Sequence, residues 1–280
     1  MTTPELVSDF GAAGFAPGAA DLPAAPQAHA PARGATTRIL LWDLPLRVFH
    51  WSLVASVTTA IVTGELGGSW MPWHGRAGLA IVGLLVFRIV WGVLGSATAR
   101  FTQFAPTPSS VVAYLRGRWR GVGHNPLGAL SVFGLLGLLA LQAATGLFGN
   151  DDISFAGPLN HLVDETLGGR VTGWHRLLAD ALFVLVGLHL AAVLFHVVVK
   201  RRRLIRPMIA GLQDVEAGTP LPRPVRHARA GLAVSVGLAL AGLGGLLWAG
   251  SEPAPAAQAE AAAPTAAAIV APPASSAPAW

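Results

Sequence analysis

Five long apolar stretches constrain the fold of this chain more than any other feature. They cover residues 43–64, 72–94, 126–148, 173–199 and 231–249. Each is close to the roughly 20 residues that an α-helix needs to cross the hydrocarbon core of a bilayer. Only 12% of the residues are charged, about half the fraction found in typical soluble domains. The sequence therefore predicts an all-α integral membrane protein.

The fifth stretch differs from the others in composition. Residues 231–249 are rich in Ala, Gly and Leu, and small residues allow close packing against a neighbouring transmembrane helix. A helix lying in the membrane surface is the alternative, but the stretch shows no polar face. We predict a four-helix bundle core in the lipid bilayer, with a fifth transmembrane helix added to it.

The remaining segments are predicted to be tails and a linker. The terminal segments are rich in Ala and Pro and bury too little apolar surface to fold, so we expect disordered termini. No basic segment leads into an apolar stretch near the N-terminus, so no cleavable signal peptide is expected. The predicted organisation is a cytoplasmic tail (1–37), a transmembrane domain (38–212), a cytoplasmic linker (213–230), the fifth helix (231–249) and an Ala/Pro-rich tail (250–280).

Basic residues gather on one side of the predicted spans. The segment between the second and third spans contains arginines and no acid, and the segment after the fourth span begins with KRRR. Because loops rich in Arg and Lys stay in the cytoplasm, we expect a cytoplasmic N-terminus. These flanking residues also account for the net charge of +5, so we expect no nucleic acid partner.

Four histidines lie within or at the ends of the apolar stretches: His50, His74, His175 and His189. Ionisable side chains inside a membrane are costly and usually functional. His175 and His189 are fourteen residues apart on one stretch. That spacing on a helix places two side chains within about 40° of the same face and about 21 Å apart along the axis. This helix is therefore expected to present imidazoles at two depths.

In the predicted orientation these four histidines form two pairs, each at one depth in the membrane. His74 and His175 lie at the same depth near the outer surface, while His50 and His189 lie nearer the cytoplasm. Helix bundles hold cofactors between inward side chains of facing helices. Neutral imidazole is a good metal ligand, and two imidazoles fill both axial positions of a haem iron. The pattern predicts two haems, although an interhelical hydrogen bond could explain any one histidine alone.

The absence of cysteine limits which cofactors the chain can bind. It excludes iron–sulfur clusters and covalent haem attachment through a C-x-x-C-H motif, so any haem would be held by imidazoles alone. Zinc is the competing metal, but imidazoles about 21 Å apart on one helix cannot bind the same ion.

Four more residues are candidates for contacts with a haem edge or a quinone. His196 is on nearly the same face as His189 and about 10 Å further inward, so spacing alone leaves both as candidates for the inner ligand. His124 lies at the inner interface, where a lipid phosphate is another contact. Arg47 and Arg88 share faces with His50 and His74, and can pair with haem propionates or anchor the helices at lipid head groups.

Several motifs within residues 38–212 occur together in a known order. They are DLPLRVFHW, WHGRAGLAIVGLLVFRIVW, GHNPLGAL, WHRLLADALFVLVGLHLAAVLFHVV and RRLIRPMIAG. This order resembles the bacterial cytochrome b561 and nickel-hydrogenase cytochrome b family. The resemblance implies a four-helix core with two b-type haems, ligated from the first, second and fourth helices. Its fourth-helix histidines are fourteen residues apart, which selects His189 over His196, and it pairs His50 with His189 and His74 with His175.

The resemblance also implies a function in the bacterial inner membrane. Family members move electrons between the quinone pool and partners at the outer face, including hydrogenases, reductases and c-type cytochromes. We therefore expect a dihaem cytochrome b that relays electrons between quinone and a periplasmic redox protein. An enzyme that passes electrons from superoxide to quinone is the alternative, because some members oxidise superoxide. A transporter or scaffold without a cofactor is a third interpretation, and it predicts a colourless protein.

Charges near the outer pair bear on these alternatives. The loop between the third and fourth spans carries Asp151, Asp152, Asp164 and Glu165, which a basic protein surface would complement. We therefore expect a redox partner to dock there. Superoxide is an anion, so its oxidation would need positive charge instead, which Arg76, Arg170 and Arg176 can supply.

Overall fold

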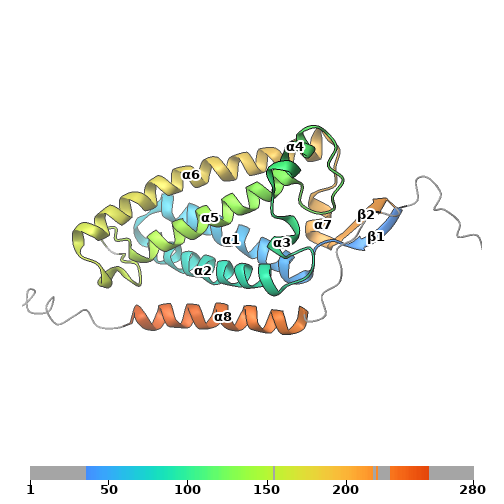
Figure 1. Cartoon of the computed structure of the whole chain (residues 1–280). Helices are drawn as coiled ribbons and strands as arrows, with labels where there is room; N and C mark the ends of the chain where they lie inside the picture. The colour runs from blue at the N-terminus through green and yellow to red at the C-terminus, as the bar shows by residue number, and fades with distance from the viewer. Residues whose placement is uncertain (1–35, 154, 217–218, 220–227, 252–280) are drawn as a thin grey trace, which may run out of the picture.

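The computed structural model describes residues 36–153, 155–216, 219 and 228–251. The predicted tails up to residue 35 and beyond residue 251, and most of the predicted linker, lie outside these residues. In the described part the chain is mostly helical, with long helices running side by side (Figure 1).

Five helices of the described residues are long and apolar enough to cross a membrane. They are α1 (Leu44–Leu66), α2 (Met71–Leu94), α5 (Pro126–Phe148), α6 (Glu165–Val198) and α8 (Ala228–Ala249). Each contains one of the predicted stretches almost completely. The prediction of a multi-pass all-α membrane protein is confirmed.

Polar side chains fix where three of these helices begin. Asp43, Asn125 and Asp164 each accept a hydrogen bond from the backbone N–H three residues further on, which satisfies a donor that the helix itself leaves unpaired. Because Asp164 supplies this cap, α6 begins at Glu165 rather than at the predicted residue 173. The additional turns carry His175 well inside the helix.

The helices pack as two pairs with an additional helix on one side. α1 packs against α2, α5 packs against α6, and α2 also contacts α5. α8 lies along the outer side of α2 (Figure 1). It runs from Gly231, which is next to Leu94, to Gly250, which is next to Pro158, so it extends over the full length of the bundle. This favours a transmembrane helix over one lying in the membrane surface.

Buried apolar residues form two clusters along the bundle. One contains Ile81, Leu85, Leu139 and Leu182 at the centre. The other contains Trp42, Leu46, Phe49 and Trp91, where α1 begins and α2 ends. Large apolar side chains such as Val184 and Leu188 are exposed on the outer surface, as expected where lipid replaces a protein neighbour.

A short two-stranded ribbon joins distant parts of the chain. β1 (Thr36–Leu40) pairs antiparallel with β2 (Leu212–Glu216), and an ion pair of 3.1 Å joins Arg38 to Asp214. The sequence predicted a disordered tail at residues 36–37 and a linker at 213–216. In the structure these residues are paired strands instead, because each strand supplies the backbone partners that the other lacks.

Three short helices complete the described fold at the same end as the ribbon (Figure 1). They are α3 (Phe101–Phe104), α4 (Pro108–Leu115) and α7 (Ile205–Ala210). Gly211 follows α7 with a φ of +82°, and its carbonyl accepts hydrogen bonds from the N–H groups of Leu41 and Trp42. These contacts hold the start of α1 against the segment after α6.

Candidate haem sites

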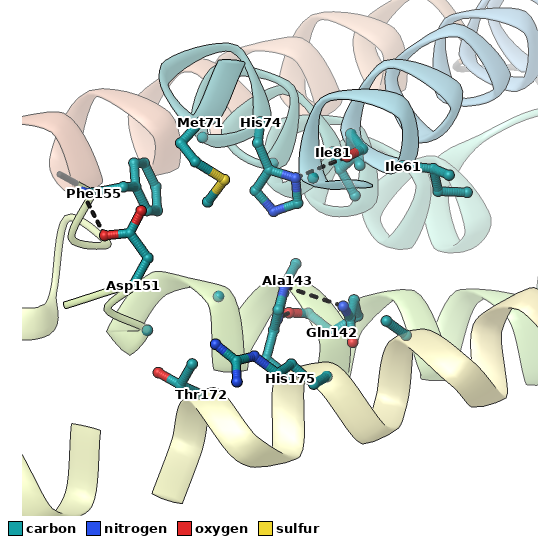
Figure 2. A pocket seen from close by; sticks show the side chains of 18 of the residues that line it. Ile61, Met71, His74, Ile81, Gln142, Ala143, Asp151, Phe155, Thr172 and His175 are labelled. Atoms are coloured by element: carbon teal, nitrogen blue, oxygen red, sulfur yellow. Dashed lines mark hydrogen bonds between the residues drawn. The ribbon is translucent and has the colours of Figure 1, made fainter. Parts of the chain in front are cut away.

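His74 of α2 and His175 of α6 face each other across a cavity (Figure 2). We call them the outer pair, after the predicted orientation. Their ring centroids are 6.0 Å apart, and the ring planes are nearly perpendicular at 85°. The cavity has a volume of about 470 Å³, within the range typical of cofactor sites. The structure thus brings together two histidines that are far apart in the sequence.

Backbone carbonyls orient both rings of the outer pair. His74 Nδ1 donates to Ala60 O at 2.8 Å, and His175 Nδ1 donates to Gln142 O at 3.0 Å. A proton on Nδ1 leaves the lone pair of Nε2 available as a ligand, which is the usual arrangement of metal-binding histidines. His175 Nε2 accepts a hydrogen bond of 3.2 Å from the side-chain amide of Gln142.

Two glycines make room for these rings. A Cβ atom on Gly64 of α1 would lie 2.9 Å from His74 Nδ1, and one on Gly146 of α5 would lie 2.9 Å from His175 Cε1. Both contacts are shorter than van der Waals separation, so these positions exclude a side chain. Neither residue was predicted from the sequence, because the chain contains 33 glycines and spacing alone does not distinguish these two.

The rim of the cavity includes a structured turn. Asp151 Oδ1 accepts hydrogen bonds from the N–H groups of Ile153 and Phe155, and Phe155 packs against Gly75 at the start of α2. Glu65 and Arg176 also line the cavity. Asp151 and the capping residue Asp164 therefore have structural roles in addition to the docking role that the sequence predicted.

His50 of α1 and His189 of α6 form the inner pair, and they are close enough to interact electrostatically. His189 Nδ1 is 3.3 Å from Ser131 Oγ. His50 Nδ1 is buried and has no hydrogen-bond partner among the described residues. Neither ring is therefore held by a backbone carbonyl through Nδ1, in contrast to the outer pair.

His124 is enclosed beside the inner pair. Its ring centroid lies 4.6 Å from those of both Trp42 and Phe104, and its Nδ1 is buried without a hydrogen-bond partner in the described part of the chain. Burial, together with the positive charge of Arg88 and the nearby His50, lowers the pKa of His124 to about 4. The ring is therefore neutral near pH 7, which disfavours the lipid phosphate contact that the sequence left open.

Arg88 is buried in the bundle, with only 2% of its surface exposed. Its Nη1 donates to Ala99 O at 3.0 Å, and its guanidinium lies 4.3 Å from the centre of the Phe101 ring. Anchoring at lipid head groups is therefore the wrong interpretation for this residue. Arg47 donates through Nη1 to Ile209 O, while its Nε is buried with no partner among the described residues.

His196 is held by other groups. Its Nδ1 donates to Ala192 O at 2.9 Å, and its Nε2 is 3.2 Å from the hydroxyl of Tyr114 on α4. Both ring nitrogens thus have partners outside the inner pair. This arrangement favours His189 over His196 as the residue that faces His50.

Comparison with known proteins identifies the class of this molecule. Residues 41–211 match the family described as prokaryotic cytochrome b561. Because the match covers more than half of the chain, the chain belongs to this family of membrane electron-transfer proteins that carry b-type haem. α8 and both strands of the β1–β2 ribbon lie outside the matched residues.

Several known proteins are similar to the chain at low identity. One is the "Probable Ni/Fe-hydrogenase B-type cytochrome subunit" of Azotobacter vinelandii, which is 26% identical over 62% of this chain and 88% of the relative. Another is the "Probable Ni/Fe-hydrogenase 1 B-type cytochrome subunit" of Escherichia coli K12, which is 22% identical over 49% of this chain and 74% of the relative. No solved structure gives a significant match.

Proposed function

We propose that this protein is a dihaem cytochrome b of the bacterial inner membrane, with a cytoplasmic N-terminus. It relays electrons between the quinone pool and a periplasmic redox protein. In this proposal His74 and His175 bind one haem b, and His50 and His189 bind the second. The b-type haem is expected from the family, and the two sites are inferred from the arrangement of the histidines.

The geometry of the outer pair is the observation that carries the proposal. Its ring centroids are 6.0 Å apart. Metal–imidazole bonds are about 2 Å long, so two such bonds and half of each ring span about 6 Å in total. The glycines at positions 64 and 146 leave space for the two rings beside α1 and α5. The residues present therefore fit a haem iron between these two histidines.

Two imidazole ligands per iron determine the chemistry. When both axial positions are filled, a haem exchanges electrons and does not readily bind oxygen. The chain supplies the remaining contacts. Arg47, whose Nε is buried without a partner in the described residues, is suited to a propionate of the inner haem. The neutral ring of His124 is suited to a haem edge or a quinone head group.

The partner follows from the relatives. Proteins named as hydrogenase cytochrome subunits are part of a redox complex, and we propose a redox protein partner for this chain as well. It would dock at the acidic α5–α6 loop, whose Asp151 lines the outer cavity, because a basic protein surface would complement these charges. Asp152 in this loop and Glu165 at the start of α6 are exposed, and we propose both for this contact.

Superoxide oxidation is the second candidate. Arg176 lines the outer cavity and would attract an anion, but the acids Glu65 and Asp151 line the same cavity and would repel it. We therefore place electron relay first. Either function needs haem, so the absorption spectrum separates both from a transporter or scaffold.

The test uses the purified full-length protein in detergent. We expect b-type bands in the reduced-minus-oxidised spectrum, and oxidation of the reduced protein by added quinone. Because the outer ring planes are nearly perpendicular, the oxidised protein should also give a highly anisotropic low-spin ferric EPR signal. A colourless protein contradicts the proposal. Rapid reduction by superoxide, with none by quinol, would favour the second candidate.

A further inference from the structure

Two arginine-rich segments lie at the end of the bundle that carries the β1–β2 ribbon. One follows α4 and the other follows α6, and α4 lies beside the end of α6 (Figure 1). A hydrogen bond of 3.2 Å joins the hydroxyl of Tyr114 on α4 to Nε2 of His196 on α6, two residues that are 82 positions apart. The tertiary structure therefore brings together two basic segments that are distant in the sequence.

The cations of these two segments are exposed and lack ion-pair partners among the described residues. Residues 97–125 and 197–211 contain no acid, and Asp214, the first acid that follows, is paired with Arg38. The charge of these cations is therefore not balanced within the described part of the chain. We call them the basic surface: Arg116, Arg118, Arg120, Lys200, Arg201, Arg202, Arg203 and Arg206.

Both helices end in a turn that keeps the following cations beside the helix end. After α4, Gly117 has a φ of +68°, and the N–H of Arg118 donates back to a carbonyl of the helix at 2.8 Å. After α6, Arg201 has a φ of +52°, and the N–H of Arg202 donates back to a carbonyl of α6 at 2.9 Å. Glycine is the usual residue in such a turn. Arg201 therefore places a charge at a position whose backbone conformation favours glycine.

Aromatic residues place the basic surface at the level of the lipid head groups. Trp119 lies between two of the arginines, and its ring packs edge-on against Tyr114, with the centroids 6.1 Å apart. Trp and Tyr are enriched where a membrane meets water. The apolar helix α6 ends at Val198, directly before the cations that begin at Lys200. The charges thus lie next to the membrane surface rather than far out in solution.

We infer that the basic surface binds the head groups of anionic phospholipids in the adjacent leaflet. A guanidinium group matches the geometry of a phosphate, and clusters of about four to eight cations beside a spanning helix attract anionic lipids. The preference of basic loops for the cytoplasm accounts for the sign of these charges. It does not account for the contact between Tyr114 and His196, which gathers the two segments. The inference goes beyond the proposed function and makes no use of the haems.

The experiment measures lipid binding to the full-length protein in a non-ionic detergent by native mass spectrometry. The probes are dioleoyl phosphatidylglycerol, which is anionic, and dioleoyl phosphatidylcholine, which has no net charge. We expect the anionic lipid to bind at least about tenfold more tightly. Equal affinity for the two lipids overturns the inference.

Variants from each segment locate the binding. Arg118→Gln and Arg202→Gln should each weaken binding of the anionic lipid about fivefold, the effect of one cation near an anionic membrane surface, and the double variant about 25-fold. Arg170→Gln is the matched control, because Arg170 is exposed on α6 near its opposite end. If Arg118→Gln and Arg202→Gln weaken binding no more than this control does, the two segments do not form a lipid site.

Arg201→Gly separates binding from folding. Because glycine suits the positive φ at this position, the variant should be at least as stable as the wild type and yet bind the anionic lipid about fivefold more weakly. Unchanged lipid affinity in this variant would contradict the inference. Haem content should be the same in all of these variants and in the wild type, so a failure of this inference is distinct from a failure of the proposed function.

Discussion

The two ends of the bundle place the same kind of ligand in different surroundings. At the outer end, His74 and His175 lie across a cavity of about 470 Å³ that reaches the turn at Asp151. At the inner end, the aromatic rings of Trp42 and Phe104 pack around His124, and Arg88 is buried nearby. The outer site is thus shaped by glycines and an open rim, and the inner site by close packing.

This difference indicates whether each end of the bundle contributes mainly to cofactor binding or to the stability of the fold. The absence of a side chain at Gly64 and Gly146 leaves space for the rings of His74 and His175, and backbone carbonyls fix their tautomers. Buried polar groups at the inner end instead stabilise the fold, because a buried charge is tolerated only with partners. Perturbing the outer end should therefore change cofactor binding, and perturbing the inner end should change stability.

The largest effect is expected from a side chain added at the outer site. Gly146→Ala places a Cβ atom 2.9 Å from His175 Cε1, so His175 must turn away and the outer haem should be lost while the inner haem is retained. Gly137→Ala on the same helix is the control, because its Cβ would have no neighbour within 4 Å. Haem quantification per polypeptide measures the difference. Equal haem content in the two variants would contradict the role of Gly146 in making room for His175.

Arg88→Met should destabilise the inner end by about 1–3 kcal/mol, the usual effect of leaving a buried hydrogen-bond acceptor without its donor. The variant leaves Ala99 O without the hydrogen bond from Nη1 and Asp43 without its neighbouring cation. Thermal unfolding in detergent measures this loss of stability. The control is Arg116→Met, because Arg116 is exposed. If the two variants melt at the same temperature, Arg88 does not support the fold.

His124 should make stability depend on pH. Burial lowers the pKa of His124 in the folded chain to about 4, against about 6.5 in an unfolded chain. Between these values the unfolded chain binds a proton that the folded chain does not, so stability decreases as the pH falls from 6.5 to 4. His124→Phe retains an aromatic ring between Trp42 and Phe104 and should remove up to about 3 kcal/mol of this acid sensitivity.

The measurement is the free energy of unfolding of the wild type and of His124→Phe across this pH range. Parallel curves for the two proteins would show that His124 is not protonated on unfolding.

The smallest effect is expected at His196. His196→Phe removes one hydrogen bond to Tyr114 and should reduce stability by about 1 kcal/mol, with both haems retained. Loss of a haem from this variant would show that His196, rather than His189, completes the inner site. Tyr114→Phe removes only the hydrogen bond to His196 Nε2 and leaves the one from Nδ1 to Ala192 O, so it should reduce stability by no more than His196→Phe does.

The sequence was sufficient to predict the transmembrane helices, because apolar length indicates a span. It also placed His74 and His175 at the same depth, and their ring centroids lie 6.0 Å apart, while their role as haem ligands stays a prediction. The β1–β2 ribbon could not be predicted, because its partners are far apart in the chain and its strands are short. The burial of Arg88 was missed for a similar reason, since it depends on Ala99 and Phe101 in the following loop.

Other features of the site depend on tertiary contacts that a single sequence does not reveal. Gly64 and Gly146 matter only because they lie beside rings from other helices. The acceptors of His74 and His175 are backbone atoms, which any residue type supplies. The contrast between the two pairs therefore emerges only from the structure.

The number of haems bound per polypeptide tests the central proposition most directly, namely that two separate histidine pairs each hold one. It should be measured on the full-length protein and on His175→Ala and His189→Ala. The account predicts two haems in the first, and one in each variant, with the two variants retaining haems of different reduction potential. A single haem in the unmodified chain, or the loss of the same haem in both variants, would contradict it.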